Sequence, residues 1–483
     1  MDAAVQIAER DEAEQPEQPE LYASWRKIHP KYQPGFFRRV RWIVTSVLLG
    51  LYYILPMLRW DRPGEMPDQA ILFDLPGRKF YIFDLVIWPQ EVFLLTFLLM
   101  AAAFGLFLMT ALAGRVFCGY ICFQTVWTDL FLWVEHWVEG PPRRRREWDA
   151  APWSLRKIGI RLIKHGLWLL IGVATGGAFV FYFADAPTLL REFLNGTAPY
   201  AAWFTLGFLT LGTYVMAGFA REQVCIYMCP YSRFQGAMFD QETLVIAYDE
   251  KRGEPRISSR RQRREGSAGD CIDCKECVRV CPTGIDIRDG QQYQCITCAA
   301  CVDACDSVMD RLRKPRGLVG YTSFDALTGV TPPRFRFRVW LYGALTLGAL
   351  GAVMFHFLTR APLELNVLRQ RQPLYVALSD GSVRNGYTAR LLNMTSQPQT
   401  YRLTVEGVKG ASLHVEAAEA AADGSYRLRA ESGEVVPYTV FVTQSEEFAK
   451  LGAQGDLPVQ FKLTGLDPTG GSASYHSVFI RPR

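Results

Sequence analysis

The residues in this sequence best suited to redox or metal chemistry are its cysteines. The chain has 483 residues and 12 cysteines, and all of the cysteines lie between residues 118 and 305. Eight of them form two runs of the spacing C-x2-C-x2-C-x3-C, which is typical of bacterial ferredoxins with two clusters. In that pattern three thiolates of a tight loop bind one cubane and the fourth binds the other. The spacing therefore predicts one [4Fe–4S] cluster on Cys271, Cys274, Cys277 and Cys305, and a second on Cys281, Cys295, Cys298 and Cys301.

Zinc and disulfides are the alternative uses of these eight cysteines. Zinc modules usually carry paired C-x2-C knuckles with four ligands each, whereas two complete runs of this kind are typical of iron–sulfur sites. Disulfides are disfavoured because the distribution of basic residues places this region in the reducing cytoplasm. Two clusters in one small domain imply electron transfer in single-electron steps.

The remaining four cysteines form two matching pairs at the ends of apolar stretches. Cys118 and Cys122 lie in GRVFCGYICFQTVW, and Cys225 and Cys229 lie in REQVCIYMCPYSRF. The shared pattern C-x-Y-x-C indicates a parallel internal repeat, a device that builds one site between two halves of a membrane protein. The i, i+4 spacing predicts that both thiols of a pair share one helix face. Soft thiolates there would suit copper, zinc or a further iron–sulfur cluster; a dithiol couple and buried packing cysteines are the alternatives.

Five stretches are apolar enough and long enough to cross a hydrocarbon layer about 30 Å thick. They cover residues 42–58, 92–113, 166–183, 200–220 and 339–358. From Phe123 to Val138 the apolar residues recur with helical periodicity, which predicts an amphipathic helix on the membrane surface or packed against the spans. Lys164, at the edge of the third span, is expected to extend its charge toward the interface.

The charges of the short loops set the expected orientation. Residues 22–41 carry six Lys or Arg and residues 114–161 carry eight, whereas residues 184–198 carry one. The positive-inside rule therefore places the N-terminus in the cytoplasm and, after five crossings, the C-terminus outside. Residues 1–20 are acidic and unlike a signal peptide, so the first span is expected to be an uncleaved anchor. These features predict a multi-pass protein of a bacterial inner membrane with a periplasmic C-terminal domain.

The expected fold is a multi-domain membrane protein with an α-helical transmembrane core. Its parts are a cytoplasmic segment 1–40, the core 41–220, a cytoplasmic insert 221–338 with a ferredoxin-like domain at 265–310, the fifth span 339–358 and an external domain 359–483. The external domain contains seven short alternating segments separated by turn residues such as SDG, RNG and DPTGG. This pattern predicts an immunoglobulin-like β-sandwich with a docking or structural role.

Nucleic acids and nucleotide cofactors are not indicated as partners. The formal charge of +5 is small for a chain of this length. The basic stretch 251–268 lacks an aromatic platform, so it is interpreted as a solvated linker. No G-x-G-x-x-G motif follows a predicted strand, so a nicotinamide or flavin site is not supported and the electron donor is another molecule of unknown identity.

These motifs resemble those of the cytochrome c oxidase accessory protein family, known as CcoG, FixG or RdxA. The resemblance covers nearly the whole chain from residue 20 onward. It is most specific in the cysteine motifs and in the stretch VRNGYTARLLN of the external domain. The membrane pairs match the family's C-x3-C-P motifs, except that Phe123 stands where proline follows in the first.

Members of this family are associated with the biogenesis of cbb3-type haem–copper oxidases and look like membrane-bound cupric reductases. The resemblance implies that the clusters relay electrons to a copper or terminal redox site on Cys118, Cys122, Cys225 and Cys229, where Cu(II) becomes Cu(I). It implies copper chaperones or oxidase subunits as partners, and a homodimer is a further expectation. The alternative functions are a quinol-linked polyferredoxin electron carrier and a non-enzymatic scaffold for oxidase assembly.

Overall fold

The computed structural model describes most of the chain, in two compact units. The described residues are 27–62, 66–256, 269–330, 335–395, 397–451, 456–467 and 470–482. Most of the expected N-terminal segment 1–40, and residues 257–268 of the expected basic linker, lie outside them. One unit comprises Met1–Gly50, Leu106–Gly176 and Leu206–Trp340; the other comprises Leu51–Gly105, Gly177–Thr205 and Leu341–Arg483.

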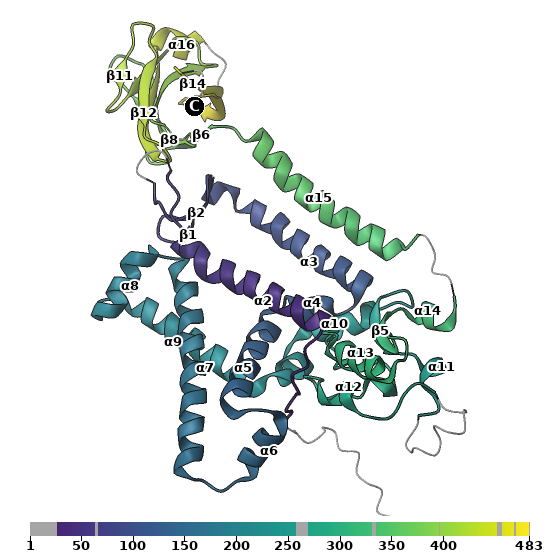
Figure 1. The fold of residues 1–483 in the computed structure, drawn as a ribbon. Coiled ribbons are helices and arrows are strands. Elements are labelled where there is room, and N and C mark those ends of the chain that lie inside the picture. Colours follow the sequence, from purple (N-terminus) through teal and green to yellow (C-terminus); the bar gives the residue numbers. More distant parts are fainter. Residues whose placement is uncertain are drawn as a thin grey trace, which may run out of the picture. The chain divides into compact units, whose positions relative to one another are not determined.

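Long apolar helices account for all five expected spans (Figure 1). These helices are α2 (Phe36–Ile54), α3 (Phe93–Ala113), α7 (Leu155–Phe181), α9 (Tyr200–Val215) and α15 (Phe337–Thr359). Helix α7 begins at Leu155, well before residue 166 where the third span was expected to start. Helix α9 continues as a π-helical turn, η3 (Met216–Ala220). Each of these helices, with its adjoining short turns, is long and apolar enough to cross a membrane.

A sixth stretch, Val116–Glu139, also meets the length and apolarity of a membrane span. It consists of the short helix α4 (Val116–Tyr120) and helix α5 (Phe123–Glu139). In the most apolar 18 residues of this stretch, 44% are buried inside the protein. The corresponding share is only 6–17% in α2, α3, α9 and α15. The ring of Phe131 stacks on Trp168 of α7 at 5.1 Å between centroids. Of the two places expected for the amphipathic helix, packing against the spans is the one observed.

The ferredoxin-like region is larger than the expected range 265–310. It contains α12 (Glu276–Arg279), a 3-10 turn η5 (Ile287–Asp289) and α13 (Ala300–Leu312). Strands β4 (Val245–Tyr248) and β5 (Val319–Thr322), which flank that range in sequence, pair antiparallel and pack on the same core. Asp303 of α13 accepts hydrogen bonds from the backbone N–H groups of Phe37 and Arg38 at the start of α2. This carboxylate at a helix N-terminus links the region to the first long helix.

The shorter helices connect these elements. They are α6 (Pro142–Ala150), α8 (Ala186–Asn195), the π-helical turn η4 (Val224–Met228), α10 (Pro230–Met238), α11 (Glu250–Gly253) and α14 (Phe324–Thr328). In the other unit, turns η1 (Leu55–Met57) and η2 (Pro89–Glu91) flank an antiparallel meander of β1 (Ile71–Asp74), β2 (Lys79–Ile82) and β3 (Leu85–Ile87).

The C-terminal domain is a sandwich of two antiparallel sheets (Figure 1). One sheet has the order β10-β13-β8-β6, with β7 also paired to β8, and the other has the order β11-β12-β9-β14-β15. Buried side chains from both sheets, including Tyr387, Tyr401, Phe461 and Phe479, form its core. The seven expected segments correspond to β6 (Leu363–Arg369), β8 (Val383–Asn393), β9 (Gln399–Glu406), β12 (Tyr426–Ala430), β13 (Val435–Gln444), β14 (Leu457–Gly465) and β15 (Ser472–Phe479). The additional elements are β7 (Val376–Ala377), β10 (Ala411–Val415), β11 (Glu419–Ala420) and α16 (Glu446–Leu451).

Candidate functional site

The two ferredoxin-type cysteine runs fold into loops with the same backbone turns. Asp273 and Lys275 in the first run have positive φ angles of 49° and 56°, and Thr297 and Ala299 at the corresponding positions of the second run have 55° and 58°. Left-handed backbone is costly for residues other than glycine, and it persists where the surroundings require it. Here it alternates with the cysteines and wraps each loop around its thiols.

The eight cysteines of these runs line two neighbouring cavities. Cys271, Cys274, Cys277 and Cys305 line one. Cys281, Cys295, Cys298 and Cys301 line the other, together with Cys277. Each set of four cysteines that the spacing assigned to one cluster thus lines one cavity. The assignment of ligands to clusters stays a prediction, because the walls of a cavity do not identify what binds in it.

The chemistry of the donor set fits iron–sulfur clusters. Burial raises the pKa of Cys277, Cys295 and Cys305 to about 12. Thiols in such surroundings become thiolates when metal ions displace their protons and compensate the charge. Each cavity offers four thiols and apolar walls, as a cubane with four cysteine ligands requires.

Each membrane cysteine pair straddles a break between two helices. Cys118 lies in α4 and Cys122 is the N-cap of α5; Cys225 lies in η4 and Cys229 is the N-cap of α10. The expectation that both thiols of a pair share one helix face is therefore wrong, because the helix ends before the second cysteine. Cys122 and Cys229 have similar backbone angles, with ψ of 127° and 111°. Phe123 thus begins its helix after the same turn as Pro230, so proline is not needed for this turn.

The internal repeat brings the thiols of both pairs near one another. The pKa of Cys225 is raised to about 12, chiefly by burial and further by the neighbouring Cys122, Cys118 and Cys229, against the opposing effect of Arg115. Among the described residues, however, no three His, Cys, Asp or Glu side chains lie close enough to hold one metal ion. The arrangement can therefore present several thiols to a metal, but a single ion would require the side chains to move together.

One of the membrane thiols lies directly against a ferredoxin loop. Cys118 packs with Ile296 and Cys298 in one buried cluster. Between the two cysteines of the first pair, Gly119 lies so close to this loop that a Cβ atom there would be 2.7 Å from the carbonyl oxygen of Ile296 and 3.1 Å from Cα of Cys298. A residue larger than glycine could not fit without displacing backbone. The first membrane pair and the second ferredoxin loop are therefore in direct contact.

Two polar residues that the sequence analysis did not single out complete this site. Gln235 of α10 is fully buried, and its Oε1 accepts hydrogen bonds from Nε of Arg115 at 2.8 Å and from Sγ of Cys118 at 3.5 Å. Its Nε2 is buried without a hydrogen-bond partner. Arg115 lies in GRVFCGYICFQTVW and Gln235 directly follows REQVCIYMCPYSRF, and these positions are the one indication of a role in the sequence.

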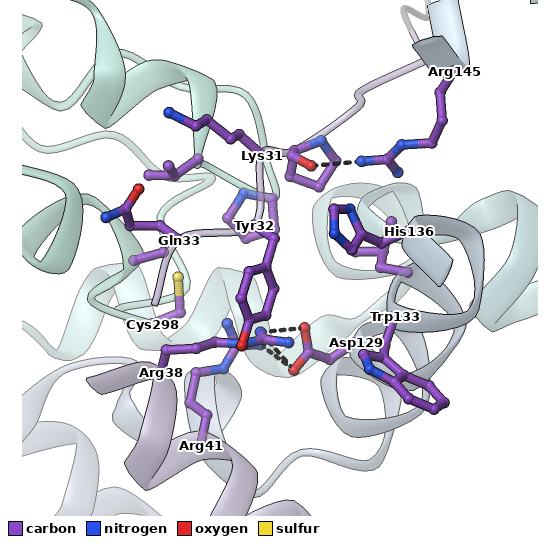
Figure 2. Close-up of a pocket in the computed structure, with 15 residues that line it drawn as sticks. Lys31, Tyr32, Gln33, Arg38, Arg41, Asp129, Trp133, His136, Arg145 and Cys298 are labelled. Carbon is purple, nitrogen blue, oxygen red and sulfur yellow. Dashed lines mark hydrogen bonds and ion pairs between the residues drawn. The ribbon is translucent and has the colours of Figure 1, made fainter. Parts of the chain in front are cut away.

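A cationic cavity lies on another side of the second ferredoxin loop (Figure 2). Arg38 and Arg41 share the carboxylate of Asp129. The ring of Tyr32 stacks on His136 at 5.7 Å between centroids. Cys298 forms part of the wall, so this cavity has the surroundings to hold a small aromatic or anionic electron carrier next to a predicted cluster ligand.

Comparison with known proteins matches these same regions. Residues 95–160 match a family model described as a 4Fe-4S binding domain, residues 220–324 match a 4Fe-4S dicluster domain, and residues 353–482 match the Ig-like fold at the C-terminal of FixG. The chain is 48% identical over 486 residues to the nitrogen fixation protein FixG of Rhizobium meliloti (strain 1021), which covers 93% of this chain and 91% of that protein. The chain belongs to the FixG family.

Two further FixG relatives come from Cereibacter sphaeroides. Protein RdxB is 50% identical over 82% of this chain and 85% of its own length, and protein RdxA is 47% identical over 82% and 86%. The expected family and the expected fold class are thus confirmed, including the Ig-like sandwich. The FixG-family chain is a membrane iron–sulfur redox protein that transfers electrons. Its two iron–sulfur family matches include all 12 cysteines.

Proposed function

We propose that this FixG-family chain reduces Cu(II) to Cu(I) at the four membrane cysteines, with electrons supplied through the ferredoxin-like region. The observation that carries the proposal is the direct packing of Cys118 against Ile296 and Cys298. An electron on the cluster of the second ferredoxin loop would then have only a short distance to cross to the thiol site. The copper product would serve the assembly of a haem–copper oxidase, with copper chaperones or oxidase subunits as recipients.

The ferredoxin cysteines hold the electron carriers in this proposal. Cys271, Cys274, Cys277 and Cys305 would bind one [4Fe–4S] cluster, and Cys281, Cys295, Cys298 and Cys301 would bind the other. When bound, these groups supply one-electron transfer, which amino-acid side chains alone provide poorly. The walls of both cavities include apolar side chains, and Cys271, Cys277 and Cys298 are buried.

The four membrane thiols are better suited to bind Cu(I), the product, than Cu(II), the substrate. Thiolate sulfur prefers Cu(I) over Cu(II). Cys118, Cys122, Cys225 and Cys229 would bind Cu(II), which takes up one electron from the ferredoxin-like region and becomes Cu(I), and no atom is transferred. Release of Cu(I) to a partner with its own soft ligands restores the site.

The location follows from the same charge distribution that set the expected orientation. We place the ferredoxin-like region in the cytoplasm and the sandwich in the periplasm of a bacterial inner membrane, because Lys and Arg concentrate in the loops at residues 22–41 and 114–161. Copper reduction would then occur at the cytoplasmic end of the membrane helices.

The test is a copper reduction assay on anaerobically purified protein. The variant in which Cys118, Cys122, Cys225 and Cys229 are all serine is expected to lose steady-state reduction of Cu(II) while it keeps its iron, sulfide and ferredoxin EPR signals. Cys305→Ser is the matched control in the other set, and it is expected to lose about half of the iron, as one cubane of two. Unchanged copper reduction in the fourfold variant would refute the proposal.

The cavity of Figure 2 favours one second candidate, a quinol-linked electron carrier. His136 could accept one of the two protons that a quinol releases, with water taking the other, and the cluster predicted on Cys298 would receive the electrons one at a time. Oxidation of a soluble quinol analogue in the absence of copper, abolished by His136→Gln, would support this function. If neither quinol oxidation nor copper reduction occurs, a non-enzymatic assembly role remains.

A further inference from the structure

Arg115 is a buried cation without an acidic partner in the part of the chain that the structure describes. Its side chain is 4% exposed. Its Nε donates to Oε1 of Gln235 at 2.8 Å and its Nη1 donates to the carbonyl oxygen of Tyr293 at 2.5 Å. No Asp or Glu of the described ranges lies within ion-pair distance of it, whereas the buried Arg145, Arg221 and Lys164 all pair with Glu135. A buried charge is stable only when something compensates it.

Cysteines from both redox sites are among the groups around Arg115 that can become anionic, together with the hydroxyl of Tyr231. Arg115 shares the Gln235 amide with Cys118 of the first membrane pair. Its charge lowers the otherwise raised pKa of Cys225 in the second pair and of Cys295 in the ferredoxin-like region. The guanidinium therefore acts on the thiol site and on a predicted cluster ligand at the same time.

Gln235 adds a second donor at the same place. Its Nε2 is buried and has no hydrogen-bond partner in the described structure, although the residue is fully enclosed. An unpaired buried N–H is costly unless an acceptor arrives. Two acceptors lie beside Gln235, the hydroxyl of Tyr231 and the sulfur of Cys118, and the sulfur is the one that gains charge when the thiol site becomes anionic.

We propose that Arg115, oriented by Gln235, is the positioning residue whose permanent charge stabilises an added electron on both the four-thiol site and the cluster bound by Cys281, Cys295, Cys298 and Cys301. The proposal rests on electron transfer between these two sites as argued above. One electron makes either site more negative by one unit, and in a buried environment a nearby fixed cation offsets that change strongly.

The experiment measures the midpoint potential of the iron–sulfur signals by anaerobic redox titration followed by EPR, without copper. Arg115→Gln is expected to lower the potential of one of the two clusters by at least 59 mV, which is tenfold in the one-electron equilibrium. Arg115→Lys keeps the charge and is expected to restore most of this shift. The control is Arg316→Gln, which removes the same charge from a side chain that is 68% exposed and paired with Asp310, so solvent is expected to screen its effect.

Iron and sulfide analysis shows whether each variant retains its clusters. If Arg115→Gln loses them, Gln235→Glu decides instead, because a carboxylate next to Arg115 cancels its charge without removing the side chain. If Gln235→Glu lowers the midpoint potential of one cluster by at least 59 mV, the proposal is supported. A shift no larger than that of Arg316→Gln, in whichever of the two variants retains iron, overturns it. Because copper is absent from this measurement, its failure leaves the copper assay untouched, and failure of the copper assay leaves this result standing.

Discussion

At the residue scale, the contact between the two redox regions depends on a missing side chain. Gly119 stands between Cys118 and Cys122, and its Cα faces the backbone of Ile296, Thr297 and Cys298. Any Cβ at this position would come within 3.1 Å of three backbone atoms, which cannot rotate away as a side chain can. The distance between the thiol site and the ferredoxin loop is therefore set by this glycine.

We expect Gly119→Ala to separate the two sites and to slow electron transfer from the ferredoxin-like region to copper. Overpacking of this kind typically costs about 1–3 kcal/mol of stability. The measurements are thermal unfolding and the rate at which Cu(II) reoxidises the reduced clusters in stopped flow. Gly212→Ala in α9 is the control, since nothing lies within 4 Å of its Cβ position; it is expected to leave the rate unchanged. Equal rates in both variants would contradict the role of Gly119.

His29 makes stability depend on pH near neutrality. Its Nε2 lies 3.0 Å from Asp149, which favours the charged ring. Burial, together with the charges of Lys27 and Arg145, outweighs this carboxylate and lowers the pKa of His29 below 6.5. The unfolded chain therefore binds a proton more readily than the folded chain, so the stability contribution is present above the unfolded pKa and is lost as pH falls through the lower folded value.

We expect the unfolding temperature of the protein to fall between about pH 7.5 and about pH 5.5, and His29→Gln to reduce that fall. Glutamine keeps a polar group near Asp149 but does not titrate. Thermal unfolding of both proteins at the two pH values provides the comparison. An identical pH dependence in wild type and variant would exclude His29 as its source.

At the element scale, helices α5, α6 and α7 are held together by buried ions. Glu135 of α5 is 0% exposed and accepts from Arg145 at 3.1 Å and Arg221 at 2.6 Å, and Lys164 of α7 lies 2.9 Å from Glu139. The expectation that Lys164 reaches the membrane interface is wrong, because its ammonium group has two carboxylates to pair with inside the protein. Ionisable groups among apolar helices are retained where they pair with one another.

Glu135→Gln is expected to destabilise the protein strongly, because it leaves Arg145 and Arg221 without their shared carboxylate. Breaking a buried ion pair by removing one partner costs about 3–5 kcal/mol. Thermal unfolding followed by tryptophan fluorescence measures the loss. Glu147→Gln serves as the control: its pair with Arg143 is largely exposed, and an exposed pair contributes about 0–1 kcal/mol. A small effect at Glu135 would mean that the network is not what joins these helices.

At the scale of the whole molecule, the number of membrane crossings depends on α5. Gln124 and Leu132 of this helix line a cavity together with Pro282 of the ferredoxin-like region, and His136 lines the neighbouring cavity with the same proline. A helix that lines cavities with the ferredoxin-like region from Gln124 to His136 is not expected to carry the chain across the membrane. We infer five crossings from the six helices that have sufficient length and apolarity.

Five crossings predict opposite locations for the N-terminal segment and the sandwich. Alkaline phosphatase fused after Arg481 is expected to be active, and green fluorescent protein at the same position is expected to stay dark. Fusions after Gly329, between the ferredoxin-like region and α15, are expected to show the reverse. Fluorescence from the C-terminal fusion would indicate an even number of crossings and a cytoplasmic sandwich.

Some of these features are determined by local sequence alone. The apolar length of the helices, the alternation of the strands and the spacing of the cysteine runs are local properties, and each correctly predicted an element: five long helices, seven strands of the sandwich and loops around the eight ferredoxin-type cysteines. The repeat of Cys118 and Cys122 by Cys225 and Cys229 correctly predicted that the two pairs have similar local structure, but the continuous helix expected for each pair was wrong.

Tertiary structure decided what these elements touch. The pairing of β4 with β5, the burial of Lys164 and the placement of α5 depend on partners far away in the sequence. The helix break within each membrane pair was also not predicted, because the i, i+4 rule assumes an uninterrupted helix. Above all, the packing of Cys118 against Cys298, with Arg115 and Gln235 beside them, joins segments more than a hundred residues apart. Spacing along the chain specifies which thiols are available, but only packing determines the distance over which an electron must move.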